Sequence, residues 1–384
     1  MNYIYKIQLM KLSTSLTSLL VLMIMMASCN ENLAKKYPKR VILKDSITVK
    51  LPHNVPKVNV SHPWSLHNGV FSFSVRNIDH SKIYSYDFNA SSWNDQVYTY
   101  HDDNGIISDA HFIFSDSLKF FNPKKDSNQL LIFHNDTLVR KIKFNKLNDL
   151  IASYNHLPDL SSKSQFQIDD NQLYFASLSS LAINPNNLKK MKLFGKYHLL
   201  KDSVSFHGNI PEDFENHSSL YLSNRRKNIA IGKDKILVNF SKLPYLLVYD
   251  KNGNFIKKTT CENKNVQNIK SLVEQANKQK TALKNHFTGN YDKVIYNDKK
   301  NVYYRISTYY QNYKKLDLKQ LLKKAFQLKR TRIHVLDSDL KTIAVNDFKG
   351  LSEHFIIVHD DELLISSGHD HADKLVFKKF QLSP

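Results

Sequence analysis

Residues 246–258 have the pattern of a β-hairpin, because two apolar-alternating runs lie on either side of Asp250-Lys251-Asn252-Gly253. The dipeptide Asn252-Gly253 suits a two-residue type I′ turn. Asp250 at the first turn position and Gly253 at the fourth also suit a type I turn that is closed by a left-handed glycine bulge. We predict the bulged turn.

The choice of turn fixes the register of this hairpin. The bulged turn places Tyr249 opposite Phe255 and Val248 opposite Ile256, whereas the tighter turn places Val248 opposite Lys257. A slip of one residue reverses which side chains of a strand face the core. The bulged register is therefore also a prediction about the core.

Looser copies of this pattern recur in pairs along the chain. The first members are residues 69–77, 110–122, 165–177, 218–240, 292–308 and 354–367, and the second members are residues 83–100, 130–144, 191–206, 246–258, 333–345 and 375–382. Four-stranded units at a spacing of roughly 40 to 60 residues are typical of β-propellers, whose radial blades bury both faces against their neighbours. The chain is therefore predicted to be all-β, with the fold of a six-bladed β-propeller; seven blades are the alternative.

Two late segments have the apolar spacing of α-helices. One helical insertion is predicted near residues 266–285, between two blades. The other is predicted near residues 316–328, within the hairpin that joins Tyr304-Arg305-Ile306 to Ile333-His334-Val335-Leu336. Both insertions would extend one propeller.

The start of the mature chain offers a way to close the ring. Residues 47–51 are strand material that no unit uses. In many propellers one terminal strand completes a blade that begins at the other terminus, so we expect these residues to pair in the same sheet as residues 375–382. Residues 41–384 are accordingly predicted to form a single β-propeller domain.

Residues 1–28 have the pattern of a secretory signal peptide. Lys6 and Lys11 precede an apolar run that is too short to span a bilayer comfortably, and the run ends in Ala27-Ser28-Cys29. These three residues resemble the lipobox of bacterial lipoproteins, in which the cysteine is acylated and becomes the first mature residue. We expect residues 1–28 to be removed, Cys29 to carry the lipid and residues 29–40 to form a flexible tether.

The mature chain resembles the six-bladed β-propeller lipoproteins of Bacteroidota, which include a family of unknown function. The resemblance rests on the lipobox, on Leu246-Leu247-Val248-Tyr249-Asp250-Lys251-Asn252-Gly253, on Val302-Tyr303-Tyr304-Arg305-Ile306 and on Ile333-His334-Val335-Leu336-Asp337-Ser338-Asp339-Leu340-Lys341. It implies a propeller that is lipid-anchored in the cell envelope, at the outer membrane on the periplasmic or the surface face. It implies no catalytic residues.

The densest group of metal-ligand side chains lies near the C-terminus. It includes His369, Asp370 and His371, in which the two histidines point the same way if the chain is extended. This spacing matches no established ligand motif, and the segment falls where two strands must be connected, as Asp360-Asp361 falls in a hairpin turn. Polar loops are the stronger interpretation, so no metal and no other cofactor is predicted.

Motifs of catalysis are missing from the sequence. It has no glycine-rich phosphate loop, no nucleophile elbow and no paired-histidine protease helix. The segments 102–105 and 250–253 are too short for a helix-loop-helix calcium site and are read as hairpin turns. Cys261 stands alone, without a sign of a lowered pKa. Whether the protein is an enzyme stays open, with a non-enzyme favoured.

The second predicted helix is surrounded by basic residues. Lys319, Lys323, Lys324, Lys329 and Arg330 form a candidate surface for an anionic partner. Two functions suit such a helix, which are contact with anionic headgroups and docking on an acidic protein. We favour a simpler interpretation, in which the helix is solvated and its leucines pack on the propeller, because an apolar stripe usually faces the protein's own core.

The formal charge of +20 is compatible with an anionic partner, although lysine-rich and asparagine-rich usage also follows from a genome of low GC content. Export argues against nucleic acid as that partner. The sequence predicts a membrane-tethered binding module for a glycan, a peptide or an envelope protein. One alternative is a propeller hydrolase or lyase whose carboxylates and histidines gather at the central channel. Another is a structural component of an envelope complex.

Overall fold

The computed structural model describes much of the chain between residues 37 and 383. The described residues are 37–51, 64–67, 70–76, 81–93, 98–102, 105–106, 111–114, 118–122, 129–134, 137–143, 156–158, 167–169, 171–179, 191–201, 203–211, 227–266, 287–313, 316, 318–367 and 373–383. The predicted signal peptide, Cys29 and residues 30–36 of the predicted tether lie outside this part. The predicted helix near residues 266–285 also lies outside it, apart from Val266.

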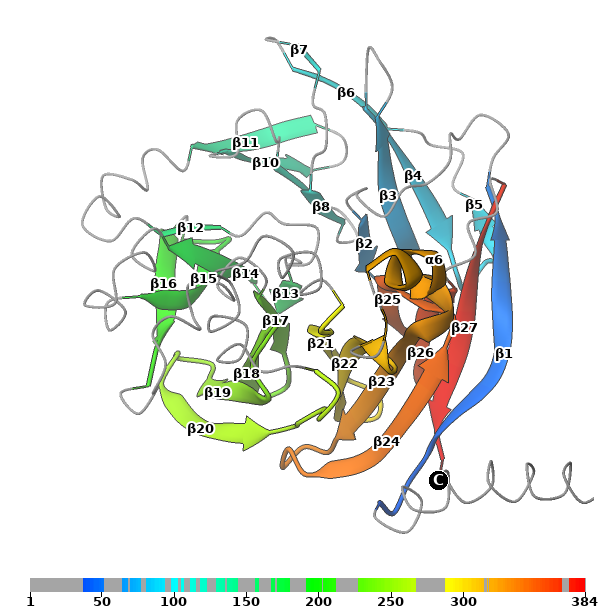
Figure 1. The fold of residues 1–384 in the computed structure, drawn as a ribbon. Coiled ribbons are helices and arrows are strands. Elements are labelled where there is room, and N and C mark those ends of the chain that lie inside the picture. Colours follow the sequence, from blue (N-terminus) through cyan, green and yellow to red (C-terminus); the bar gives the residue numbers. More distant parts are fainter. Residues whose placement is uncertain are drawn as a thin grey trace, which may run out of the picture.

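The described strands form six antiparallel sheets, drawn in Figure 1. Four of these sheets have four strands each. They consist of β8 (His111–Phe114), β9 (Leu118–Asn122), β10 (Gln129–His134) and β11 (Thr137–Lys143); of β17 (Lys227–Ile231), β18 (Lys235–Phe240), β19 (Tyr245–Asp250) and β20 (Phe255–Thr260); of β21 (Asn290–Asn297), β22 (Val302–Tyr310), β23 (Lys329–Leu336) and β24 (Thr342–Lys349); and of β25 (Leu351–His359), β26 (Glu362–Ser367), β27 (Lys374–Leu382) and β1 (Val41–Lys50).

The other two sheets are less regular. One consists of β2 (Trp64–His67), β3 (Val70–Arg76), β4 (Ser81–Asp87), β5 (Ser92–Trp93), β6 (Tyr98–Asp102) and β7 (Gly105–Ile106). The other consists of β12 (His156–Pro158), β13 (Gln167–Asp169), β14 (Gln172–Ser179), β15 (Lys192–His198) and β16 (Ser203–Asn209). Each pair of strand segments predicted from the sequence falls in one of the six sheets.

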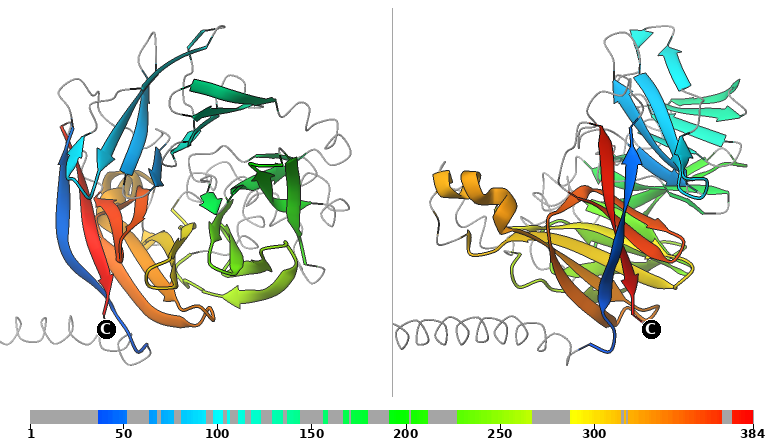
Figure 2. Two further views of the ribbon diagram at one scale, coloured as in Figure 1. Left: turned by 180° about the vertical axis from the view of Figure 1, so that it is seen from behind. Right: turned by 90° about the vertical axis from the view of Figure 1, so that its right-hand side faces the viewer.

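The sheets are arranged around a ring, as the two further views in Figure 2 show. Hydrophobic clusters join the sheet of β12–β16 to that of β17–β20, the latter to β21–β24, these to the sheet of β1 and β25–β27, and that sheet to β2–β7. Strand β2 contacts β8, and Arg140 of β11 donates a hydrogen bond to the Tyr197 hydroxyl of β15 at 3.1 Å. Radial sheets that pack face to face in a ring define a β-propeller. The chain is therefore an all-β propeller with few helices, as the sequence predicts.

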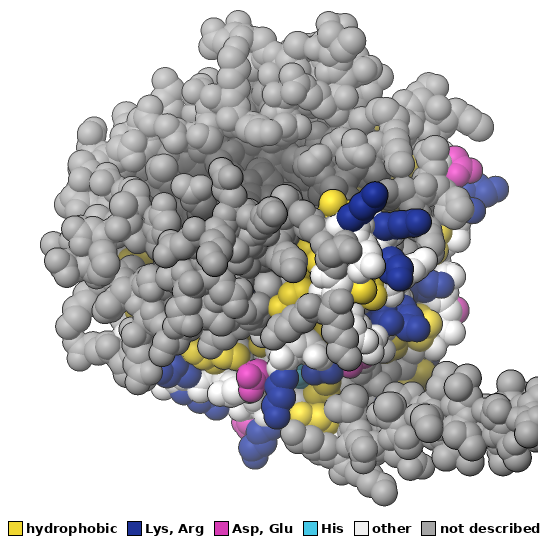
Figure 3. Space-filling view, viewed as in Figure 1, with side chains coloured by type: hydrophobic (Ala, Val, Ile, Leu, Met, Phe, Trp, Pro, Cys, Tyr) yellow, Lys and Arg dark blue, Asp and Glu magenta, His cyan; other side chains and the backbone are white. Residues whose placement is uncertain are grey.

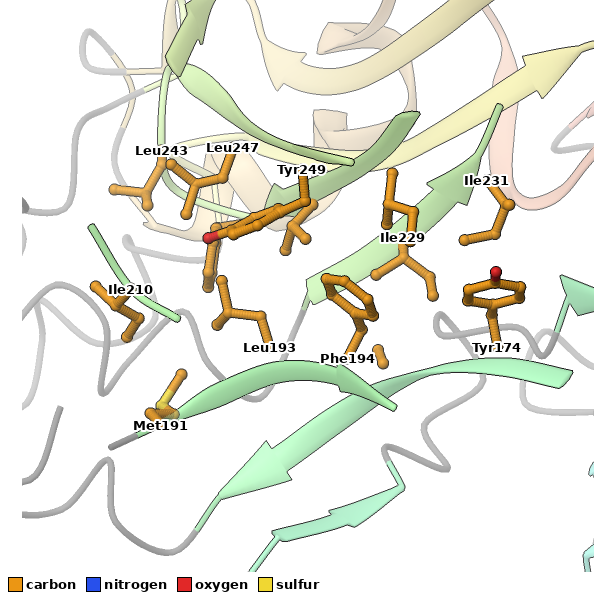
Figure 4. Close-up of a cluster of buried hydrophobic side chains, with 14 residues drawn as sticks. Tyr174, Met191, Leu193, Phe194, Ile210, Ile229, Ile231, Leu243, Leu247 and Tyr249 are labelled. Carbon is orange, nitrogen blue, oxygen red and sulfur yellow. The ribbon is translucent and has the colours of Figure 1, made fainter. Parts of the chain in front are cut away.

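One of these clusters shows how the sheets interlock (Figure 4). Tyr249 of β19 points toward β15, where its ring packs edge-on against Phe194 with centroids 5.7 Å apart. Its hydroxyl donates a hydrogen bond to the backbone oxygen of Asn209 at 2.7 Å. Leu193 and Leu247 fill the space beside this pair. The aromatic body thus contributes buried area while its polar end is satisfied.

The hairpin of β19 and β20 confirms the predicted turn and corrects part of the predicted register. The Gly253 amide donates to the Asp250 carbonyl at 3.1 Å, and Gly253 has a φ of +90°, which glycine adopts without steric cost. Tyr249 pairs with Phe255, as predicted. The predicted pairing of Val248 with Ile256 is wrong.

Val248 instead pairs with Lys257, because the register shifts between Val248 and Tyr249 and leaves Ile256 as an extra residue. This is a β-bulge next to the turn, which bends the strand. The bulge lies on β20, an edge strand whose side chains are largely exposed. Bulges and lysines on an edge strand discourage pairing with other chains.

The two ends of the described chain close the ring, as predicted. Strand β1 pairs with β27, so that Ile47 lies opposite Phe377 and Val49 opposite Leu375. The ladder is continued by the Ser383 amide, which donates to the Arg40 carbonyl at 2.8 Å. The sheet of β25, β26 and β27 is therefore completed by the first strand of the propeller.

The helix α6 (Leu318–Leu328) coincides with the segment that the sequence predicts to be helical. It connects β22 to β23 and stands away from the sheets, which the right-hand view of Figure 2 shows clearly. None of the helices among the described residues is long and apolar enough to cross a membrane.

Candidate functional site

Side-chain amides connect the innermost strands of neighbouring sheets. Gln167 of β13 donates to the Ile229 carbonyl at 2.9 Å and accepts from the Ile231 amide at 2.9 Å. Asn228 of β17 donates to the Val294 carbonyl at 2.9 Å and accepts from the Val294 amide at 3.3 Å. Each side-chain amide thus donates one hydrogen bond to the backbone of the neighbouring inner strand and accepts one from it, as a residue of a paired strand would do. These bonds hold β13, β17 and β21 side by side.

Ionisable side chains are buried next to these amides. Lys227 precedes Asn228 and is 0 % exposed, while Asp292 and Lys293 precede Val294 and are 8 % and 7 % exposed. Lys293 reaches the next sheet, where its Nζ lies 3.5 Å from the Ile356 carbonyl of β25. We call Lys227, Asp292 and Lys293 the inner polar layer. Figure 1 shows that β17, β21 and β25 border the middle of the ring.

Burial of the inner polar layer is unfavourable in free energy. Removing a charged group from water costs free energy unless it is paired or neutralised, and burial alone lowers the pKa of Lys293 to about 7. A lysine whose pKa is near neutrality can hold or release a proton and can donate hydrogen bonds to a carboxylate or phosphate. Buried ionisable groups of this kind are common at functional sites.

A second buried cation lies further out from the ring axis. Arg305 of β22 donates through Nε to Asn239 Oδ1 at 2.9 Å, through Nη1 to the Pro244 and Cys261 carbonyls at 3.0 and 2.8 Å, and through Nη2 to the Leu243 carbonyl at 2.6 Å. These acceptors belong to the sheet of β17–β20 and the chain that follows it. Arg305 therefore fastens one sheet to the next.

The remaining contacts of Arg305 connect it to the inner strands. Its second Nη2 hydrogen points to the Tyr245 carbonyl at 3.4 Å, and its guanidinium lies 3.8 Å from the ring centroid of Tyr291. Asn239 donates in turn to Asn228 Oδ1 at 3.0 Å and to the Tyr291 carbonyl at 3.1 Å. Every N–H of Arg305 thus meets a protein acceptor, so its role is structural.

Two further reactive groups are buried beside this network. Burial raises the pKa of the Cys261 thiol, so it is a poor nucleophile, in line with the sequence interpretation. Burial, reinforced by the charges of Arg305 and Arg332, lowers the pKa of His334 to about 3. His334 is therefore neutral at physiological pH.

The weak metal candidates His369, Asp370 and His371 lie outside the described residues, and so does the predicted acylation site, Cys29. Within the described ranges no three His, Cys, Asp or Glu side chains come close enough to hold a metal ion.

The acidic turn between β25 and β26 forms ion pairs. Asp360 lies 2.5 Å from the Lys299 Nζ and Asp361 lies 3.0 Å from the Lys300 Nζ. Hydrogen bonds from these lysines lower the pKa of both carboxyl groups. The turn predicted at this place is confirmed, and it packs against the turn of the neighbouring sheet.

The five basic residues predicted to form one surface fall into two groups. Lys319, Lys323 and Lys324 are exposed on α6, whereas Lys329 and Arg330 are half-buried at the start of β23. Arg330 Nη1 donates to the backbone oxygen of Gln327 at 2.7 Å and to that of Lys329 at 2.9 Å, where it satisfies the end of the helix.

The predicted apolar stripe of α6 packs on the propeller only in part. Leu321 is fully buried, but Leu322 is 61 % exposed. The favoured interpretation of the stripe as core material therefore holds for Leu321 and fails for Leu322.

Sequence reasoning missed the inner polar layer and Arg305. Arg305 interrupts an otherwise apolar and aromatic run in Val302–Tyr310, and a charge at the centre of such a run is a usable signal of a buried functional or structural group. Lys227 follows Arg225 and Arg226 and reads as part of a solvated basic run. Asp292 and Lys293 read as a strand start.

Comparisons with known proteins agree with this architecture. A model of the domain-of-unknown-function family DUF4221 matches residues 41–344. A crystal structure of a DUF4221 family member from Bacteroides vulgatus superposes with a TM-score of 0.60 at 14 % identity, covering 90 % of this chain and 99 % of the other.

A second crystal structure is that of a Bacteroides fragilis protein inferred to be exported. It superposes with a TM-score of 0.52 at 9 % identity, covering 90 % of this chain and 96 % of that one. At such identities the likeness concerns the fold. No curated protein sequence matches the chain. Because the family model spans well over half of the sequence, the protein belongs to the DUF4221 family, a family of domains of unknown function.

Proposed function

We propose that this protein is an exported, lipid-anchored β-propeller that acts as a binding module for a glycan, a peptide or a protein partner. The observation that carries the proposal is the inner polar layer, in which Lys227, Asp292 and Lys293 are buried on adjacent inner strands. Apolar residues would pack these positions at lower cost. Ionisable groups at the axis of a propeller instead suit recognition of a polar ligand.

The position of the layer supports a site at one end of the ring. Lys227 is the first residue of β17, and Asp292 and Lys293 lie in the first half of β21. The bonds between Asn228 and Val294 place these two strand starts at the same level. The layer contains two lysines and one carboxylate, so its charge balance is positive, and in a low-dielectric setting this favours ligands that carry carboxylate or other anionic groups.

We further infer that the propeller has six blades, one for each sheet. Each of the six described sheets contacts two others around the ring. The two irregular sheets retain the strand-to-strand pairing of a blade.

Lipid anchoring at Cys29 would tether this module to a membrane of the cell envelope, with the outer membrane as the expected address. Support comes from Ala27-Ser28-Cys29 in the sequence and from the similar Bacteroides fragilis protein that is inferred to be exported. The test is metabolic labelling with an alkyne fatty acid followed by fractionation. The wild-type chain should carry the label and sediment with membranes, and Cys29→Ala should do neither. Equal labelling of the two would refute the anchor.

The binding proposal is tested on arrays that present neutral glycans, acidic glycans and acidic peptides. The wild-type protein should retain at least one acidic class, and Lys293→Met should lose affinity by about tenfold or more, a typical effect of removing a charged hydrogen-bond donor. Lys349→Met, at an exposed position of β24, is the matched control. Wild-type affinity in the Lys293→Met variant would refute the site, and turnover of the bound ligand would identify an enzyme instead.

A further inference from the structure

We propose that α6 is a membrane-contacting element whose exposed face, formed by Lys319, Leu322, Lys323 and Lys324, lies on anionic lipid headgroups. This inference is independent of the ligand proposed for the inner polar layer. It rests on the proposed lipid anchor at Cys29 in one respect only, which is that a membrane lies within reach of the propeller. We call these four residues the α6 surface.

The geometry of α6 leaves this face uncovered. Leu321 is fully buried and holds the helix to the propeller, while Leu322 is 61 % exposed on the neighbouring face. In an α-helix, residues three and four apart are neighbours, so Lys319 adjoins both Leu322 and Lys323. Lys324, two residues after Leu322, lies on the other flank of the exposed side of the helix. Figure 2 shows that the helix stands away from the sheets beyond the ends of β22 and β23. The described residues leave most of this leucine uncovered, and contact with a lipid surface would bury it.

The charge of the α6 surface has one sign. The helix Leu318–Leu328 contains three lysines and no acidic residue. Among the described residues no carboxylate forms an ion pair with Lys319, Lys323 or Lys324. The nearby Asp347 is already engaged by Arg332, through two hydrogen bonds of 2.8 and 2.7 Å. In Figure 3, lysine and arginine side chains gather over α6 and the strands beside it.

A lipid surface fits this combination better than an acidic protein does. Lysines on the same exposed side as an apolar residue are the pattern of helices that lie in the headgroup region, where the lysines meet phosphates and the leucine enters the acyl boundary. The projecting surface is suited to a broad, flat partner. Lys39 and Arg40 are hydrogen-bonded to the propeller, so the free part of the predicted tether, residues 29–38, spans at most about 35 Å when fully extended. That length keeps the propeller close to the membrane.

The expected strength follows from the number of cations. Each lysine near an anionic membrane strengthens binding by about fivefold, so three lysines together contribute about a hundredfold. This attraction is screened by salt over about 10 Å at moderate ionic strength. The contribution of Leu322 is hydrophobic and is insensitive to salt.

The experiment is co-sedimentation of the chain from residue 30 with phosphatidylcholine vesicles that contain or lack phosphatidylglycerol. All described elements lie within residues 37–383, so this chain keeps the whole described fold while lacking the acyl group. One variant combines Lys319→Glu, Lys323→Glu and Lys324→Glu, and a second is Leu322→Gln. The control combines Lys201→Glu, Lys233→Glu and Lys349→Glu, which make the same charge change at exposed positions elsewhere.

The wild-type and control chains should bind the anionic vesicles, and added salt should release them. The α6 charge variant should bind at least about tenfold more weakly, and Leu322→Gln should bind a fewfold more weakly with an unchanged salt dependence. Urea unfolding midpoints close to that of the wild type show that the variants are folded. The proposal is overturned if the wild-type chain does not bind the anionic vesicles, or if the α6 charge variant binds them as strongly as the control variant does. Retention of the wild type on polyglutamate without vesicle binding would assign the surface to an acidic protein and would likewise overturn it.

Discussion

Replacement of Arg305 by methionine tests whether one buried cation holds two sheets of the ring together. Methionine matches the length of the arginine stem but supplies no donor. The substitution leaves five acceptors without their partner, namely Asn239 Oδ1 and the carbonyls of Leu243, Pro244, Tyr245 and Cys261. These acceptors stay in place because they belong to the neighbouring sheet and its connections.

The magnitude follows from these contacts. A buried acceptor that loses its donor costs about 1 kcal/mol or more. The Pro244 carbonyl keeps the Cys261 amide as a donor at 2.9 Å, so the other four acceptors together cost about 4 kcal/mol. Loss of the stacking on Tyr291, at 3.8 Å, adds to this cost. Removal of the buried charge returns about 2 kcal/mol of desolvation energy. We therefore expect Arg305→Met to lower the free energy of unfolding by about 2 kcal/mol or more.

The assay is equilibrium urea unfolding of the chain from residue 30, followed by tyrosine and tryptophan fluorescence. Arg330→Met is the control, since Arg330 is only half-buried and bonds to two carbonyls at the end of α6. Its unfolding free energy should change by less than about 1 kcal/mol. Arg305→Lys should fall between the two, because an ammonium group cannot reproduce the planar fork.

A loss of less than about 1 kcal/mol in Arg305→Met would refute the reasoning. That result would mean that the desolvation of the guanidinium cancels its hydrogen bonds, as happens for some buried ion pairs. The sheets of β17–β20 and β21–β24 would then be held together by their hydrophobic cluster and by the side-chain amide bonds of Asn228 and Asn239.

Three further predictions concern turns, protonation and thiol reactivity. Gly253→Ala should lower the free energy of urea unfolding by more than about 1 kcal/mol, because its φ is +90° and an added Cβ would lie 2.5 Å from the Cβ of His207. The control is Gly350→Ala, where φ is +68° but an added Cβ meets no atom within 4 Å, so that only the backbone strain lowers its stability. Equal losses in the two variants would contradict the clash with His207. Stability should fall as the pH drops below about 6.5, because His334 then binds a proton in the unfolded state but not in the folded state, where its pKa is about 3. The urea midpoint of His334→Gln should therefore depend less on pH in this range than that of the wild type. An unchanged pH dependence would exclude His334 as the cause. In the chain from residue 30, Cys261 should react with a thiol reagent only when the protein is unfolded in urea, because the thiol is buried and its pKa is raised. Rapid reaction of the folded protein would contradict this burial.

The sequence was informative about local pairing because strands are indicated by the alternation of apolar and polar residues, and turns by their characteristic residues. The type I turn at Asp250, the pairing of Tyr249 with Phe255 and the closure of β27 by β1 were all predictable. The bulge at Ile256 was not, because it depends on how the outer strand β20 bends away from its neighbours. A local pattern carries no information about that bend.

The candidate site was less predictable than the fold. Lys227, Lys293 and Arg305 look like surface cations until the packing shows that they lie between sheets. Contacts such as the Asn228 bonds to Val294 join residues far apart in the chain, and only the ring geometry brings them together. Leu322 of α6 shows the converse, since helical periodicity predicts a buried stripe and cannot say how much of that stripe the body covers.

The pairing of β1 with β27 also sets the order in which this protein can acquire its structure. The partner of the first strand, Lys374–Leu382, is the last of the described strands to be synthesised. Until then β1 has an unpaired edge, and its contacts have the longest sequence separation that the chain allows, which makes them slow to form. The ring therefore cannot close before β27 has been made, and until then the other sheets form without the strand pair that joins the two ends of the described chain.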